Sequence, residues 1–277
     1  MFTLDIAVHA IKITLFVFIM MVLIDWLDIR SRGKLHEWVS GRKFRQYLVA
    51  SFLGATPGCL GAFMNVSLYI HGFLSFGAVV GAMIATSGDE SYVMFAEFPK
   101  IALLLHFLLF ALGILFGFVT DYLVKLFKME TCQECQLQVY HPNEHSTKHY
   151  LTEHVWNHIV KKHLIRVFLW TFFALWVVQF GLIHFNLDQF VKEYPQIMLL
   201  SAVLIGLIPE SGPHLIFVMM FSQGIVPFSI LLASSMVQDG HGMLPLLSYT
   251  VKDSIRIKFF NAVYGLLVGG VLMAAGL

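Results

Sequence analysis

Two long stretches of this chain carry almost no charge, and proline interrupts both. Residues Gln46–Gly88 contain no Asp, Glu, Lys or Arg, and Tyr194–Gln238 contain a single formal charge, Glu210. Each stretch exceeds the roughly 20 residues that a helix needs to cross a bilayer. Neither can be one straight helix, because Pro57 and Pro209 remove a backbone hydrogen bond and clash with the preceding turn. Broken backbone at membrane depth requires cover by protein or a water-filled cavity, so both stretches are expected to be discontinuous helices.

The composition agrees with a membrane protein. Of 277 residues, 58% are hydrophobic and 13% are charged, whereas an ordinary soluble domain has about 25% charged residues. The net charge of +1 excludes a nucleic-acid binder that relies on bulk positive charge. We therefore predict an all-α polytopic membrane protein whose partner is the lipid bilayer. Further stretches long enough to cross it are Ile6–Trp26, Ile101–Val119, Ile165–Ile183 and Phe259–Leu277.

The two broken stretches are copies of each other. A shift of 152 positions aligns residues 54–120 with 206–272 without a gap, and twelve positions are identical. Six of the twelve are Gly or Pro, which set backbone geometry: Gly54/Gly206, Pro57/Pro209, Gly72/Gly224, Gly88/Gly240, Gly113/Gly265 and Gly117/Gly269. We therefore predict an internal duplication, with a first transmembrane repeat at 1–127, a linker at 128–164 and a second repeat at 165–277.

The two repeats are expected to have inverted topology. If each half crosses three times and adds a short re-entrant segment, at 73–85 or 225–236, the total is about six full crossings plus two short segments. An odd number of crossings inverts the second copy, which is the architecture in which secondary transporters bind substrate at the bilayer midplane. If the short segments cross fully instead, the repeats are parallel.

The distribution of Lys and Arg predicts the orientation. Basic residues cluster in the loops 28–45 and 120–166, and positively charged loops stay on the cytoplasmic side. We expect these loops, including the linker, to be cytoplasmic and both termini to lie outside. The second re-entrant region is expected to add Lys252, Arg256 and Lys258 on the same side.

The two breaks are candidates for the substrate pathway. A break exposes unpaired carbonyls on one side and a half-helix N-terminus on the other, so it can bind ions of either sign. The alternative is a proline kink that only shapes packing. The predicted pathway residues are Pro57, Gly58, Cys59, Asn65, Ser87, Pro209, Ser211, Gly212 and Gln238.

Glu210 is the centre of a predicted metal site. A charged side chain at mid-membrane costs about 2.5–3.5 kcal/mol on insertion scales and usually lines an ion or proton path. His214 follows four residues later, so a helix starting near Ser211 would put both side chains on one face. Carboxylate and imidazole suit a divalent transition metal or a proton relay. The alternatives are a Glu–His pair that only stabilises the bundle and, at the ends of the short segments, ordinary polar turns. With the polar residues that end the short segments, the predicted ligands are Glu210, His214, Asp239, His241, Asp89 and Glu90.

The linker contains a second candidate metal site. Cysteine and histidine at close spacing can form a tetrahedral zinc-type site, which would serve metal sensing or delivery. A polar helix at the membrane surface is the alternative. The candidate ligands are Cys132, Cys135, His141, His145, His149, His154 and His158.

The motifs around the two breaks are similar to those of a known family. The strings LGATPGCLGAF and LIPESGPHLIF, with the SGDE and QDGH runs that follow them, resemble a bacterial family named for heavy-metal export, also for manganese transport, and associated by name with arsenic efflux. The resemblance implies a multi-helix permease of the bacterial inner membrane. It also implies that Pro57 to Cys59, Pro209 to His214, Ser87 to Glu90 and Gln238 to His241 form the distinctive part of the protein.

Three functions remain open from the sequence. The leading one is a secondary exporter of a divalent transition metal, manganese first and zinc or iron next, exchanged for protons and needing no cofactor or enzymatic activity. A translocator of an oxyanion or lipid-carrier phosphate would use half-helix N-termini, but it calls for an Arg or Lys that neither broken stretch contains. A membrane hydrolase with a fixed metal is the third. A homo-oligomer is compatible with each.

Overall fold

The computed structural model describes residues 43–88, 90–131, 194–222 and 224–276, together with scattered positions in 4–22 and 165–176. Within this part of the chain all regular structure is helical, and one isolated β-bridge joins Gly58 to Gly88. The prediction of an all-α protein is confirmed there. Of the predicted spans Ile6–Trp26 and Ile165–Ile183 only these scattered positions are described, and nearly all of the linker falls outside the described residues.

Between residues 43 and 131 the first half forms five helices, and serine and proline mark the start of two of them. Ser75 caps one helix, because its hydroxyl accepts a hydrogen bond from Ala78 N at 3.2 Å. Pro99 occupies the first turn of a helix of 28 residues, where its missing N–H is not needed. The helices are α3 (Lys43–Gly54), α4 (Leu60–Ile70), α5 (Phe76–Ala85), α6 (Glu90–Glu97) and α7 (Pro99–Leu126).

The second half repeats this order, with a 3₁₀ turn before two of its helices. Matching helices begin 152 positions apart, as Lys43 and Pro195 do for α3 and α11, and Phe76 and Phe228 do for α5 and α13. The duplication seen in the sequence therefore extends to the helix boundaries. The elements are α11 (Pro195–Gly206), η2 (Gly212–His214), α12 (Leu215–Ser222), α13 (Phe228–Val237), η3 (Gly240–Gly242), α14 (Met243–Tyr249) and α15 (Val251–Ala274).

Helical structure is interrupted at both predicted breaks. α3 ends at Gly54 and α4 begins at Leu60, so the chain leaves the helix around Pro57. In the second half α11 ends at Gly206, and regular structure resumes at Gly212. Each break therefore places the last carbonyls of one helix close to the first N–H groups of the next.

Two helices of the described chain, α7 with 28 residues and α15 with 24, are long and apolar enough to span a membrane. They contain all or most of the spans predicted from residues 101 and 259, but α15 begins at Val251. The helix therefore starts before the span predicted from Phe259 and includes Lys252, Arg256 and Lys258. The reason is a cap: the Thr250 hydroxyl accepts a hydrogen bond from Asp253 N at 3.3 Å, so the helix starts before its apolar part.

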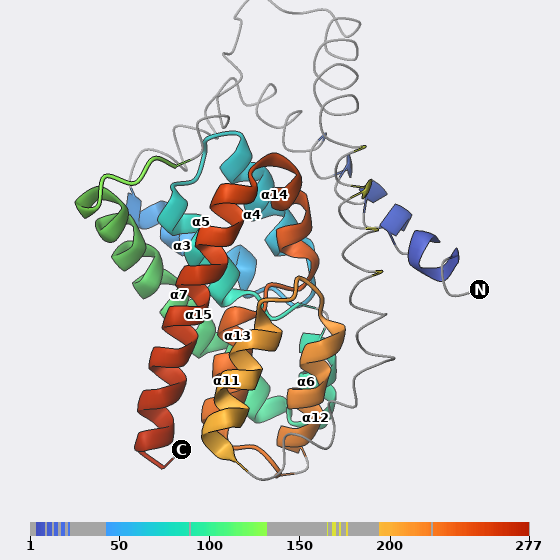
Figure 1. Cartoon of the computed structure of the whole chain (residues 1–277), viewed down its shortest axis with the longest axis vertical. Helices are drawn as coiled ribbons and strands as arrows, with labels where there is room; N and C mark the ends of the chain where they lie inside the picture. Colours follow the sequence, from blue (N-terminus) through green and yellow to red (C-terminus); the bar gives the residue numbers. More distant parts are fainter. Residues whose placement is uncertain are drawn as a thin grey trace, which may run out of the picture.

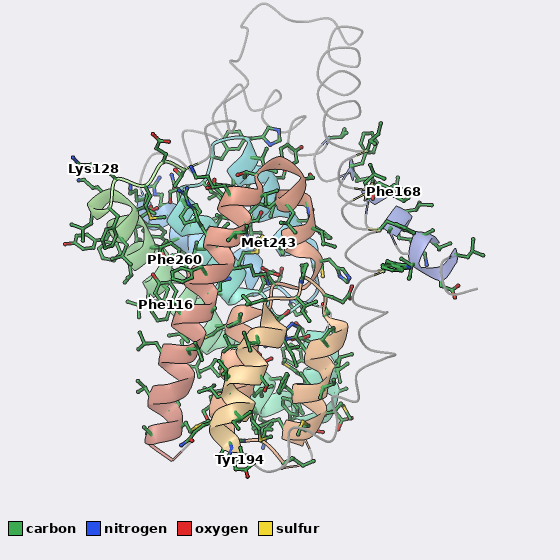
Figure 2. All side chains as sticks on the ribbon, viewed as in Figure 1. Phe116, Lys128, Phe168, Tyr194, Met243 and Phe260 are labelled. Atoms are coloured by element: carbon green, nitrogen blue, oxygen red, sulfur yellow. The ribbon has the colours of Figure 1, made fainter. Side chains whose placement is uncertain are left out.

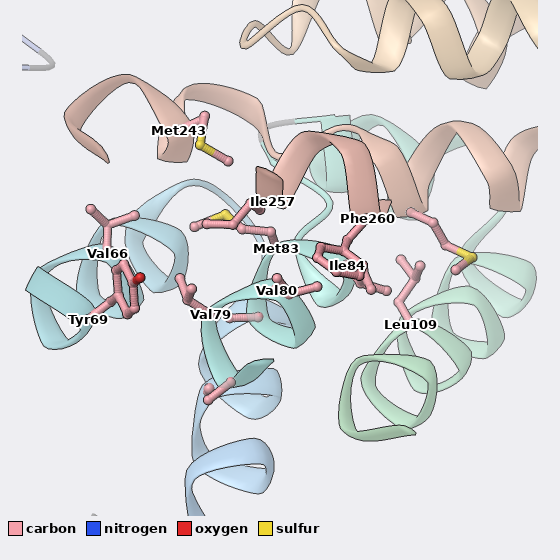
Figure 3. Close-up of a cluster of buried hydrophobic side chains, with 14 of the residues drawn as sticks. Val66, Tyr69, Val79, Val80, Met83, Ile84, Leu109, Met243, Ile257 and Phe260 are labelled. Carbon is pink, nitrogen blue, oxygen red and sulfur yellow. The ribbon is translucent and has the colours of Figure 1, made fainter. Parts of the chain in front are cut away.

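The short helices α5 and α13 lie at the centre, and every residue of α5 is buried. Side chains of α5, including Val80 and Ile84, pack against Ile257 and Phe260 of α15 in the main hydrophobic core (Figure 3). α15 runs along most of the length of the bundle (Figure 1). Phe116 of α7, labelled in Figure 2, stacks on Tyr264 of α15, and their ring centroids lie 4.1 Å apart. The halves are therefore held together by a continuous apolar core.

The outward surfaces of the two long helices are apolar. Phe107 of α7 and Phe259 of α15, which occupy matching positions in the two halves, are both exposed. Many other large apolar side chains of the described residues are exposed as well. A surface of this kind is typical of a protein surrounded by lipid. The structure thus agrees with a polytopic membrane protein.

The two halves also exchange equivalent contacts. α4 packs against α14 of the other half, and α12 packs against α6. Helix α4 corresponds to the segment that forms η2 and α12, and α6 corresponds to α14. Each half therefore receives from the other the contact that it provides.

Candidate functional site

The turns that follow α5 and α13 meet at two glycines. Gly88 and Gly240 have φ angles of +58° and +52°, a conformation that glycine adopts without strain. A β-carbon on Gly240 would lie 3.4 Å from the Cα of Gly88, and one on Gly88 would lie 3.6 Å from the Cα of Gly240. Gly58, in the first break, donates its N–H to the carbonyl of Gly88 at 3.0 Å. The first break and both turns therefore converge on one place.

Gln238 links the two turns. Its Nε2 donates to the carbonyl of Thr86 at 3.1 Å, and its Oε1 accepts from Gly240 N at 3.0 Å. Gln238 and Thr86 occupy equivalent positions, 152 residues apart. The side chain predicted for the pathway thus joins the two halves at matching points.

His241 joins the two breaks. Its Nε2 lies 2.8 Å from Oε1 of Glu210, and its Nδ1 lies 3.7 Å from the Sγ of Cys59. Cys59 belongs to the first break, Glu210 to the second, and His241 to the turn after α13. We call these three residues the junction. The imidazole of His241 is buried and the carboxylate of Glu210 is largely buried. The junction is therefore a cluster of polar side chains inside the bundle.

The expected pairing of Glu210 with His214 does not form. Glu210 contacts His241, whereas the fully buried His214 places Nδ1 3.2 Å from the hydroxyl of Ser234 on α13. The reason lies in the backbone, because Glu210 precedes all regular structure of this segment and Gly212–His214 form a 3₁₀ turn instead of the start of an α-helix. Such a turn has about three residues per turn, so residues four apart do not share a face as in an α-helix.

Asp239 forms a buried ion pair that the sequence interpretation missed. Its Oδ1 accepts from Lys258 Nζ at 2.8 Å, and the same Nζ donates to the carbonyls of Gly206 at 2.9 Å and Val237 at 3.3 Å. Lys258 comes from α15, outside the two uncharged stretches. The sequence contained a signal for this burial, because Lys258 precedes the repeat-matched Gly265 by two helical turns and so lies on the same face of the helix. In the structure this face packs against α13, since a β-carbon on Gly265 would meet Val237.

Several buried polar atoms of the site have no hydrogen-bond partner among the described residues. They are Ser87 Oγ, Glu210 Oε2, Ser211 Oγ, His214 Nε2 and Asp239 Oδ2. Buried polar atoms are normally satisfied, so such a group calls for an explanation such as an ion or a ligand. Across the described ranges, no three His, Cys, Asp or Glu side chains are gathered closely enough to hold one metal ion.

The remaining predicted residues lie apart from the junction or have structural contacts. Asn65 is buried on α4 and donates to the carbonyl of Ala50 at 2.9 Å, which ties α4 to α3. Glu90 is buried at the first position of α6. Pro57 and Gly212 are exposed and Pro209 is half-buried. Asp89 and the linker residues Cys132 to His158 lie outside the described residues.

Comparison with protein families adds to the helical fold, the duplicated breaks and the junction. The family described as "Putative, 10TM heavy-metal exporter" matches residues 3–172 and 122–275. The chain belongs to this family. The description names ten transmembrane helices, against the six crossings and two short segments expected from the sequence. No curated protein and no solved structure match the chain. Membership confirms the resemblance seen in the break motifs and supports a membrane transporter of metals rather than an enzyme.

Proposed function

We propose that this chain is a secondary transporter that exports a divalent transition-metal cation, with manganese as the first candidate and zinc or iron as alternatives. The cation binds near the bilayer midplane between the two broken helices, in the inner membrane of a bacterium. The contact between His241 and Glu210 at the junction carries the proposal, because it pairs two metal-binding side chains beside the first break, where Cys59 lies. The transporter needs no resident cofactor.

The chemistry of the junction suits exchange of a metal for protons. A cation that binds the imidazole of His241 and the carboxylate of Glu210 replaces the contact between them at 2.8 Å. Protein ligands bind metals in their deprotonated form, so metal binding releases protons. Manganese prefers oxygen donors, whereas imidazole and thiol also suit zinc. The proposed coupling ion is therefore the proton, and the test includes several metals.

The proposed topology has two inverted repeats, at 1–127 and 165–277, with re-entrant segments at 73–85 and 225–236 and both termini outside. The exchange of contacts between α4 and α14, and between α12 and α6, supports a two-fold relation between the copies. The linker 128–164 is proposed to be cytoplasmic and to capture metal with its Cys and His side chains before transport.

One observation favours the alternative of an anionic substrate. Lys258 supplies, inside the bundle, the positive charge that this function requires. Its ammonium, however, is already bound by Asp239 at 2.8 Å and by two main-chain carbonyls. Because the paired charges cancel, the site offers an anion little net attraction. The metal cation therefore remains the preferred substrate.

Transport by Glu210→Gln tests the proposal. Purified protein in proteoliposomes is assayed for uptake of Mn²⁺, Zn²⁺ and Fe²⁺ and, in parallel, of phosphate. We expect the variant to lose metal uptake by about tenfold or more, the scale on which changes around a metal site act. Glu97→Gln, which alters an exposed acid on α6, is the matched control and should transport normally. Normal metal uptake by Glu210→Gln would refute the assignment, and phosphate uptake without metal uptake would establish the alternative.

A further inference from the structure

The ammonium of Lys258 lies where two helices of the second half end. Its Nζ contacts the carbonyl of Gly206, the last residue of α11, at 2.9 Å, and that of Val237, the last residue of α13, at 3.3 Å. The last carbonyls of a helix have no partner within it and carry the negative end of the helix dipole. Two such helix ends and the carboxylate of Asp239 therefore create a strongly negative electrostatic potential at one position inside the bundle.

This point is a binding position for a cation. It offers two main-chain carbonyls and a carboxylate, the oxygen donors that manganese and other hard cations prefer. Asp239 is fully buried, and its second oxygen, Oδ2, has no hydrogen-bond partner among the described residues. The carboxylate thus keeps a free oxygen for a further ligand while Oδ1 holds the ammonium at 2.8 Å.

The first half lacks this charged pair. The positions equivalent to Lys258 and Asp239, 152 residues earlier, are His106 and Ser87. His106 turns to its own helix, with Nδ1 2.7 Å from the carbonyl of Ala102, and packs on Phe95 at 4.9 Å between ring centroids. Because the same helix arrangement forms there without either charge, the ion pair is not a requirement of the fold.

We propose that Lys258 is a tethered cation that competes with the transported metal for the carboxylate of Asp239 and the carbonyls of Gly206 and Val237. While no metal is bound, the ammonium keeps the buried carboxylate paired, which avoids the cost of an isolated buried charge. A metal ion entering from the junction takes the position and displaces the ammonium. When the ammonium returns, it favours release of the metal. This inference rests on the proposed function and names the device that keeps metal binding weak enough for turnover.

The affinity of Lys258→Met for Mn²⁺ tests the inference. Methionine has a similar length and no charge, so it removes the competitor and leaves the three oxygen donors. Titration calorimetry of the purified full chain should give a Kd about tenfold or more below that of the wild type, because a like charge next to the metal is removed. Lys258→Arg keeps the charge and should not bind more tightly. Lys252→Met, at an exposed position of the same helix, should match the wild type.

A purely structural role for Lys258 predicts the opposite result. Loss of a structural ion pair would leave Lys258→Met with equal or weaker Mn²⁺ affinity, and this outcome overturns the inference. If Lys258→Met does not fold, Lys258→Ala is prepared with ethylammonium, which fits the space that the side chain leaves. Ethylammonium should then raise the apparent Kd for Mn²⁺ in Lys258→Ala and not in the wild type. Absence of this competition also overturns the inference.

Failure of the inference can be told apart from failure of the proposed function. If the wild type neither binds nor transports Mn²⁺, Zn²⁺ or Fe²⁺, the proposed function is wrong and the inference falls with it. If the wild type transports metal and Lys258→Met does not bind it more tightly, only the inference is wrong.

Discussion

Replacing Gly81 by alanine should separate α5 from α7 and destabilise the first half. The two helices cross at four glycines, with Gly77 and Gly81 of α5 against Gly117 and Gly113 of α7. A β-carbon on Gly81 would lie 2.2 Å from the carbonyl oxygen of Gly113, and one on Gly113 would lie 2.5 Å from that of Gly81. The backbones are in direct contact, as in other membrane helix pairs with small residues four apart.

The size of the effect follows from these distances. A carbon rests against a carbonyl oxygen at about 3.3 Å or more, so the alanine methyl requires the helices to move apart by about 1 Å. Inserting a methyl into a packed core costs about 1–3 kcal/mol. At roughly 2–4 °C per kcal/mol for a chain of this size, the Tm should fall by about 2–12 °C. Because α5 leads into the turn at Gly88, metal uptake should fall as well.

Thermal unfolding of the detergent-solubilised protein, followed by tryptophan fluorescence, measures this change. Gly270→Ala is the matched control, since a β-carbon on Gly270 of α15 meets no atom within 4 Å. Alanine is also the better helix former, so the Tm of the control should stay unchanged or rise. Equal Tm values for Gly81→Ala and Gly270→Ala would refute the view that direct backbone contact holds α5 on α7.

Two further changes test contacts that hold the elements around the site. Tyr69→Phe removes a hydrogen bond of 2.7 Å from α4 to the buried carboxylate of Asp253 on α15, so the free energy of unfolding should fall by about 1.5–3 kcal/mol, measured by denaturant titration; an unchanged value would mean that the bond adds nothing between the halves. Asp121→Ala removes the acceptor of Gly77 N at the start of α5, at 2.7 Å, and should cost about 1–3 kcal/mol. Its control is Lys43→Ala, since an ion pair of Asp121 with a largely exposed lysine contributes at most about 1 kcal/mol; equal losses for the two variants would contradict this reasoning.

Some features of the fold could be predicted from the sequence because they depend on local geometry. Pro57 and Pro209 interrupt the helices wherever the chain folds, since proline removes a backbone hydrogen bond. The matched glycines Gly88 and Gly240 mark the two turns with positive φ, which side chains other than glycine seldom adopt. The duplication, seen as a shift of 152 positions, followed from such residues and reappears in the helix boundaries.

The pairing of the polar side chains was not predictable in the same way. Spacing along the chain suggested His214 as the partner of Glu210, but a 3₁₀ turn changed the face and His241 took its place. The predicted span began at Phe259 and left Lys258 outside it, but a capping threonine brings Lys258 into α15 and the helix packing buries it against Asp239.

The sequence by itself thus determined where the backbone breaks, that the unit is duplicated and that the protein belongs in a membrane, because each of these depends on residues close in the chain or on composition. Only the tertiary structure decided that Cys59 meets His241 and that Lys258 meets Asp239. Those contacts depend on how α15 and the two turns pack in three dimensions, and no periodicity within one helix specifies the distance between side chains of different helices.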